Sequence, residues 1–149
     1  MIDDNIKLIP YRSEFSDFIY LTKKNAYKKY VEECWGVWDE KKQKIMFEKF
    51  INMVKNDTYI IQFDGVNVGF YNGETLEDGS YEIGNICIIP EYQGKSIGTK
   101  VLKYFMELHK KQNLHIQYFK QNPVGVLYKR LGFVPDYEKD FHYVMKKTK

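Results

Sequence analysis

Residues 81–98, YEIGNICIIPEYQGKSIG, contain the transition that decides the fold. The apolar run at 82–89 predicts a β-strand, which Pro90 ends. The loop QGKSIG at 93–98 follows, and from Ile97 onward apolar residues recur at helical spacing. The first N–H groups of a helix have no internal partner and lie at the positive end of the helix dipole. A strand, a glycine-containing loop and a helix in this order can therefore hold a phosphate group.

The segments on both sides of this stretch predict further strands and helices in a regular order. They predict an α/β fold with a single mixed, twisted sheet of about seven strands, flanked by about four helices. A polar loop is expected at 72–80. The expected strands lie at 5–11, 58–63, 66–72, 82–89, 114–118, 133–137 and 141–146, and the expected helices lie at 13–30, after Asp39, after Ile97 and at 123–132.

Length and composition limit the class of protein. The chain has 149 residues, of which 44% are hydrophobic, and this predicts a single domain over residues 1–149. The acidic start from Met1 to Asp4 is unlike a signal peptide, and no apolar run approaches the ~18 residues of a membrane-spanning helix. We therefore expect a cytoplasmic protein without membrane contact. The net charge of only +3 does not predict a nucleic-acid partner.

The cysteines and histidines give no sign of a metal site. Cys34 and Cys87 lack the spacing of metal ligands, and His109, His115 and His142 lie in unrelated contexts. We expect reduced, partly buried thiols and no metal ion.

The loop at 93–98 does not match two common phosphate-binding motifs. The nucleoside triphosphatase loop requires GxxxxGK followed by Ser or Thr, and its first glycine would fall on Ile89. The dinucleotide fingerprint GxGxxG requires a closer pair of glycines than Gly94 and Gly98, which three residues separate.

A second motif at 122–133, NPVGVLYKRLGF, combines with this loop into a recognisable pattern. The chain resembles the GNAT family of N-acetyltransferases, in which a loop Q/R-x-x-G-x-G/A follows a strand. In that family an Asn then precedes a Tyr on a later helix that ends in Gly-Phe. Gln93 and Gly98 match the loop, and Asn122 and Tyr128 match the later motif. The resemblance implies the GNAT fold, with acetyl-CoA as cosubstrate.

Ser96 departs from the family pattern, because a glycine is usual at its position. If the backbone there needs a positive φ, serine costs on the order of 1 kcal/mol relative to glycine. The backbone N–H remains, and the serine hydroxyl can donate to a phosphate oxygen. We expect binding of the cosubstrate that is weakened but not abolished.

The resemblance implies that two neighbouring parallel strands, here 82–89 and 114–118, splay apart and receive the pantetheine arm of acetyl-CoA. Lys95 or Lys100 could meet the 3′-phosphate, although a row of helix lysines is usually only solvated. The residues implied in cosubstrate binding are Cys87, Ile88, Ile89, Gln93, Gly94, Lys95, Ser96, Ile97, Gly98, Thr99, Asn122 and Tyr128.

Two residues are candidates for proton transfer when an amine attacks the thioester directly. An alkyl amine with a pKa of ~10.4 must lose a proton near neutral pH. Glu82 is the candidate base, acting directly or through water, and Tyr128 is the candidate acid for the departing thiolate. The alternatives are a solvent-facing strand-end glutamate and a core tyrosine.

The acceptor side is predicted at 27–40, YKKYVEECWGVWDE, because the first two helices form it in this family. Tyr30, Glu33 and Trp35 are the candidate substrate-binding residues, for a primary amine on a small molecule or peptide. Aromatic residues that only bury a loop are the alternative. A non-catalytic acyl-CoA sensor and a nucleic-acid-binding module remain as alternative functions, and monomer and homodimer are both open.

Overall fold

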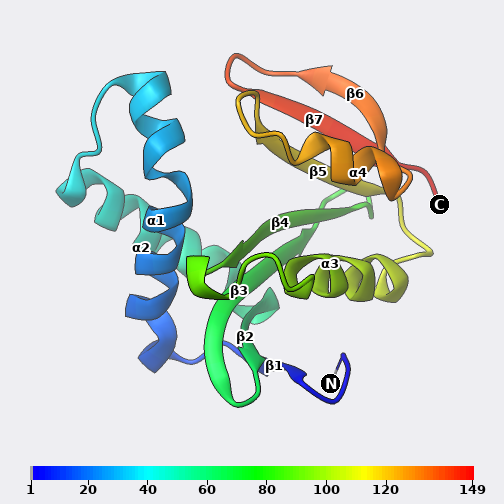
Figure 1. The fold of residues 1–149 in the computed structure, drawn as a ribbon. Coiled ribbons are helices and arrows are strands. Elements are labelled where there is room, and N and C mark those ends of the chain that lie inside the picture. Colours follow the sequence, from blue (N-terminus) through cyan, green and yellow to red (C-terminus); the bar gives the residue numbers. More distant parts are fainter. Residues whose placement is uncertain (1) are drawn as a thin grey trace.

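A computed structural model describes residues 2–149 as one seven-stranded sheet with helices on both faces (Figure 1). The strand order is β1-β2-β3-β4-β5-β7-β6, in which β4 and β5 are parallel and every other neighbouring pair is antiparallel. The prediction of a mixed sheet is therefore confirmed. The elements are β1 (Ile6–Pro10), α1 (Ser16–Trp35), α2 (Glu40–Val54), β2 (Thr58–Phe63), β3 (Val66–Thr75), β4 (Tyr81–Ile88), α3 (Ile97–Leu108), β5 (Leu114–Phe119), α4 (Gly125–Arg130), β6 (Val134–Glu138) and β7 (His142–Lys147).

Two hydrophobic clusters lie on opposite faces of the sheet. Successive side chains of a strand point to opposite faces, so Ile60 packs with α1 and α2 while Ile61 packs with α3. Phe47 and Ile51 contribute from α2, and Phe105 contributes from α3. This double burial explains why the central strands are apolar at consecutive positions rather than at alternate ones.

Two element boundaries differ from the sequence-based expectation. β3 continues to Thr75, because its last residues pair with the start of β4, where a polar loop at 72–80 is expected from composition. Thr75 pairs with Tyr81, which is fully buried, so the polar end of β3 is held in the sheet by its pairing with β4. Helix α1 runs beyond Tyr30 to Trp35 and ends at Gly36, which has a φ of 89°.

The pairing of β4 changes abruptly in the middle of the strand. β4 pairs with β5 only from Tyr81 to Ile83, whereas it stays paired with β3 as far as Ile88. On the β3 side, Asn72 pairs with Asn85 and the next residue pairs with Ile83, so one residue of β4 is left over as a β-bulge. Beyond this bulge β4 and β5 separate.

Gly84 is the extra residue of the bulge, and Asn72 fixes it. The buried Asn72 side chain accepts hydrogen bonds from the Asn85 backbone N–H at 3.1 Å and from the Asn85 side-chain amide at 2.7 Å. A Cβ on Gly84 would lie 2.5 Å from Asn72 Nδ2. Only glycine fits against this clamp.

We predict that Asn72→Ala lowers the free energy of unfolding by about 1–3 kcal/mol, because it leaves a backbone N–H of the bulge without its acceptor. Urea denaturation measures this loss. The control is Asn67→Ala, also in β3, which removes a half-buried side-chain hydrogen bond to Gln62 and should cost less than about 1 kcal/mol. Equal losses would contradict a special role for the bulge.

Candidate active site

Two adjoining cavities open where β4 and β5 separate. The larger, of about 830 Å³, lies between β4, β5 and the two N-terminal helices. The smaller, of about 480 Å³, lies between the end of β4, the loop before α3, and α4. Ile86, Ile88, Gln93, Val124 and Tyr128 line both. The two cavities thus share a wall, and we call them together the cleft.

The backbone of β4 turns alternate residues into the cleft. The Ile89 N–H donates to the Val68 carbonyl of β3 at 2.8 Å. Because hydrogen-bonding groups alternate in direction along a strand, Cys87 also faces β3, and the amides of Ile86 and Ile88 face the side that β5 has left. The sequence does not single out Ile86, because this alternation depends on register and not on residue type. The Ile88 carbonyl accepts from Gln93 Nε2 at 2.9 Å.

The loop before α3 has the backbone shape of an anion cradle. Gly94 and Ser96 have φ angles of 79° and 65°, so the positive φ considered for Ser96 is confirmed. Gly94, Ser96, Ile97, Gly98 and Thr99 all line the smaller cavity. The Ser96 hydroxyl accepts no capping hydrogen bond from the first N–H groups of α3. The first N–H groups of α3 therefore point at a space that suits a phosphate group.

The two lysines considered for a terminal phosphate lie outside the two cavities. Lys95 is exposed. Lys100 forms an ion pair with Asp3, with Nζ and Oδ2 separated by 3.2 Å. Asn122 does line the larger cavity, and its Oδ1 accepts from the Val124 N–H at 3.0 Å, which fixes the turn before α4.

Tyr128 stands at the junction of the two cavities. Among residues 2–149, no side chain or backbone group is hydrogen-bonded to its hydroxyl. Burial, followed by the nearby Cys87 and Tyr118, raises the pKa of Tyr128 to about 12. The hydroxyl is therefore protonated at neutral pH and free to donate.

Glu82 lines the larger cavity near the start of β4, opposite Glu74 on β3. Burial raises the pKa of Glu82, and the charge of Glu74 raises it further, whereas Lys139 and His115 oppose this shift. The carboxylate is thus a stronger base than an exposed glutamate.

Cys87 is not arranged as a nucleophile. Burial raises the pKa of its thiol to about 11, and the Cys87 Sγ–H donates to the Tyr27 hydroxyl across 3.5 Å. Since the thiolate is the reactive form, the protonated thiol is unreactive near neutral pH.

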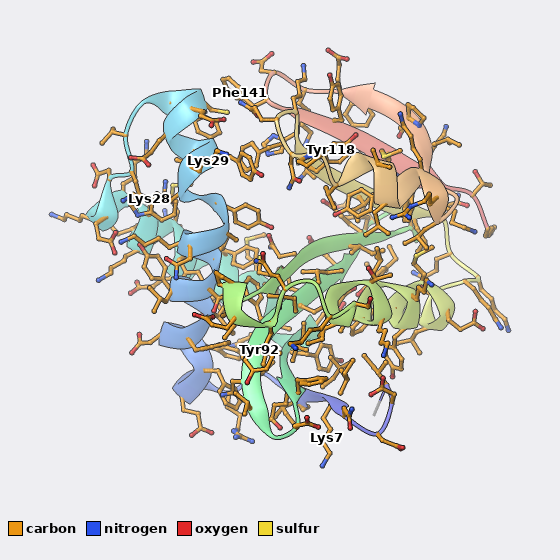
Figure 2. The ribbon with its side chains drawn as sticks, in the orientation of Figure 1. Lys7, Lys28, Lys29, Tyr92, Tyr118 and Phe141 are labelled. Atoms are coloured by element: carbon orange, nitrogen blue, oxygen red, sulfur yellow. The ribbon has the colours of Figure 1, made fainter. Side chains whose placement is uncertain are left out.

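Aromatic side chains join α1 to the strands on the other side of the cleft. Phe119 of β5 stacks on Tyr30 with ring centroids 5.2 Å apart, and Trp35 meets Phe141 edge to face at 4.8 Å. Figure 2 shows Phe141, in the turn of the β6–β7 hairpin, beside the end of α1. Of the candidate acceptor residues, Tyr30 lines the larger cavity, whereas Glu33 and Trp35 do not. The helical phase that turns them away was not evident from the sequence.

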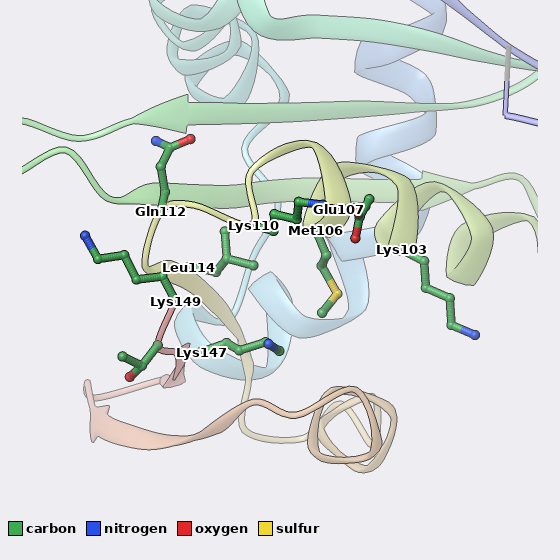
Figure 3. Close-up of a pocket in the computed structure, with 9 residues that line it drawn as sticks. Lys103, Met106, Glu107, Lys110, Gln112, Leu114, Lys147 and Lys149 are labelled. Carbon is green, nitrogen blue, oxygen red and sulfur yellow. Dashed lines mark hydrogen bonds and ion pairs between the residues drawn. The ribbon is translucent and has the colours of Figure 1, made fainter.

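A separate pocket of about 320 Å³ lies between the end of α3 and the end of β7 (Figure 3). Four lysines line it, namely Lys103, Lys110, Lys147 and Lys149, and Glu107 pairs with Lys110 at 2.7 Å. None of the predicted site residues lies in this pocket.

Residues 2–149 contain neither a cluster of metal ligands nor a membrane-spanning helix. No three His, Cys, Asp or Glu side chains gather there in a way that could hold a metal ion. No helix in the same range is both long and apolar enough to span a bilayer.

Comparisons with known proteins relate this geometry to a family. A family model described as an acetyltransferase (GNAT) domain matches residues 55–135, more than half of the 149-residue chain. A comparison with curated protein sequences gave no match.

Solved structures with low sequence identity share the fold. The PaiA N-acetyltransferase of Thermoplasma acidophilum in complex with coenzyme A is 17% identical, with 97% of this chain and 99% of that chain covered and a TM-score of 0.72. An N-acetyltransferase from Staphylococcus aureus is 14% identical over 94% and 99%, with a TM-score of 0.75. An acetyltransferase from Thermus thermophilus is 11% identical over 96% of each chain, also with a TM-score of 0.75. Together with the family model, this fold shows that the chain belongs to the GNAT family of acetyltransferases.

Proposed function

We propose that the protein transfers an acetyl group from acetyl-CoA to the primary amine of a small molecule or peptide. The observation that carries this proposal is the separation of β4 from β5 beside the loop and helix terminus at 93–99. The separation leaves backbone donors and acceptors along one wall of the cleft and an anion cradle at one end. An elongated ligand with a phosphorylated end matches this arrangement.

The residues of the cleft suit coenzyme A. Ile86 and Ile88 would hold the pantetheine arm through backbone groups, and Gly94 to Thr99 would hold the pyrophosphate. Asn122, on the opposite wall, has side-chain amide hydrogens left to donate after its oxygen is used within its own turn. When bound, acetyl-CoA supplies an activated acetyl group as a thioester.

The larger cavity provides what an amine acceptor needs. Glu82 would take the proton from the ammonium, directly or through water, and its raised pKa brings it closer to the pH at which it must act. Tyr30 forms part of the cavity wall.

Tyr128 would return a proton to the sulfur that leaves. The hydroxyl holds its proton at neutral pH, has no competing partner in residues 2–149 and borders both cavities. A thiol with a pKa of ~8.5 leaves as a thiolate with limited assistance. We therefore expect Tyr128 to make only a moderate contribution to the rate.

A non-catalytic acyl-CoA sensor is the second candidate, and the backbone of Ser96 favours it. A serine at a φ of 65° in the cradle costs about 1 kcal/mol relative to glycine. Bound cosubstrate without turnover over a broad panel of amines would favour the sensor over the enzyme.

Calorimetric titration with acetyl-CoA is expected to show binding.

Ser96→Gly should raise the free energy of unfolding by about 1 kcal/mol by relieving the left-handed serine. Ser96→Ala keeps this conformation but removes the hydroxyl, and should weaken binding by about 3- to 10-fold if the hydroxyl donates to phosphate. An absence of binding by the unaltered protein would overturn the proposed function.

Tyr128→Phe is expected to lower kcat by about 10²-fold, at the low end of the range for acid–base groups. Because the hydroxyl has no partner within residues 2–149, thermal stability should change little. The control is Tyr143→Phe, an exposed tyrosine of β7 that lies outside the cleft. A loss of less than about threefold in kcat would refute the role of Tyr128 as the acid.

The pH dependence of kcat/KM should report Glu82. Glu82 can accept a proton only as the carboxylate. As the pH falls through the raised pKa of Glu82, kcat/KM should fall, and this should happen at a higher pH than for an ordinary glutamate. Glu82→Gln should remove this acidic limb and lower the rate. Glu74→Gln removes a negative neighbour, which lowers the pKa of Glu82, so the limb should move to lower pH. An acidic limb that survives Glu82→Gln would assign the base to another group.

A further inference from the structure

Lys23 of α1 differs from the other lysines of its helix. It lines the larger cavity, and its Nζ lies 3.8 Å from the centroid of the Phe50 ring of α2. Lys28 and Lys29 of the same helix are exposed, and Figure 2 shows their positions on α1. Lys23 therefore places a cation in the wall of the cavity, while Lys28 and Lys29 are solvated.

The Lys23 ammonium has no ion-pair partner among residues 2–149. Glu40, the partner of the neighbouring Lys24 at 2.8 Å, is already engaged and also accepts hydrogen bonds from Tyr20 and Trp38. Burial lowers the pKa of Lys23, since loss of solvent disfavours its charged form. An anion beside it would restore part of the lost solvation.

The opposite charge lies elsewhere in the same cavity. Lys23 is one helical turn from Tyr27, which contacts Cys87 near the end of β4. Glu82 and its neighbour Glu74 lie near the start of β4, and Glu82 is about 15 Å from Cys87 along the strand. The cavity is thus positive toward the α1–α2 side and negative toward the start of β4.

We propose that Lys23 binds a carboxylate of the acceptor, so that the acceptor is a small amine that also carries a carboxylate group. This inference rests on the proposed acetyl transfer. The ammonium of such an acceptor would face Glu82 and Glu74, and its carboxylate would pair with Lys23. A polyamine would instead place a second cation against Lys23, where like charges repel.

The test compares ω-amino acids of increasing length, from 4-aminobutanoate to 12-aminododecanoate, with diamines and alkylamines of matched chain length. The preferred acceptor should be one of the longer members, because its two charged groups must reach from Lys23 to Glu82. We expect kcat/KM to favour an ω-amino acid over its matched diamine by about 10-fold or more. Lys23→Met should reduce this ratio by a similar factor, and Lys23→Glu should reverse it. Lys23→Arg, which keeps the charge, should retain most of the preference.

Lys28→Met is the matched control, because it removes an equal charge from the exposed part of the same helix. It should leave the ratio of the two acceptors unchanged, and thermal melting should confirm that all variants fold. A preference for diamines, or a ratio that Lys23→Met does not change, would overturn the proposed role of Lys23.

Binding measurements separate this proposal from the proposed function. Calorimetry with the preferred ω-amino acid, with coenzyme A present, should show affinity that falls about 10-fold or more in Lys23→Met. Such binding without acetylation of any amine would refute the transfer reaction and retain the carboxylate site. Acetylation without carboxylate preference would refute the site and retain the reaction.

Discussion

The contact between Asn72 and Asn85 is the constraint on which the rest of the site depends. It holds one extra residue, Gly84, in β4 and so breaks the register with β3. Past this point β4 continues along β3 but no longer along β5, and the cleft occupies the resulting gap. Asn72 is buried, so the clamp is made of polar groups that satisfy each other inside the sheet. A polar side chain in the middle of a strand thereby determines where the cleft opens.

Burial then sets the protonation of the groups along the cleft. The same loss of solvent raises the pKa of the Cys87 thiol, the Tyr128 hydroxyl and the Glu82 carboxyl. Its chemical effect differs for each: the thiol loses its nucleophilic form, the hydroxyl keeps a proton to donate, and the carboxylate becomes more basic. With Glu82 as the proposed base, Tyr128 as the proposed acid and no reactive thiol, the site suits the direct transfer that we propose rather than a covalent enzyme intermediate.

Much of the fold was predictable, because the decisive signals are local. The switch at Ile97 from a strand pattern to helical spacing of apolar residues depends on neighbouring residues. The same holds for the helix start at Asp39 and the helix end before Gly132. What the sequence could not provide depends on how elements pair and pack against one another. The alternation that turns the Ile86 amide into the cleft is set by pairing with β3, and the polar end of β3 is ordered by its pairing with β4. The direction of Trp35 follows from its contact with Phe141, more than a hundred residues away.

The lysines of α1 illustrate the same limit for function. The net charge of +3 counts each lysine equally, yet neighbouring lysines of α1 differ in burial and in their partners. Lys24 is neutralised by Glu40, Lys28 is solvated, and Lys23 is half-buried against Phe50 in the cavity wall. Exposed charges are screened by water and salt, whereas a partly desolvated charge acts strongly on a nearby ligand. The positive charge in this cavity wall is therefore determined by the helical phase of α1 and its packing on α2, and the overall composition does not reveal it.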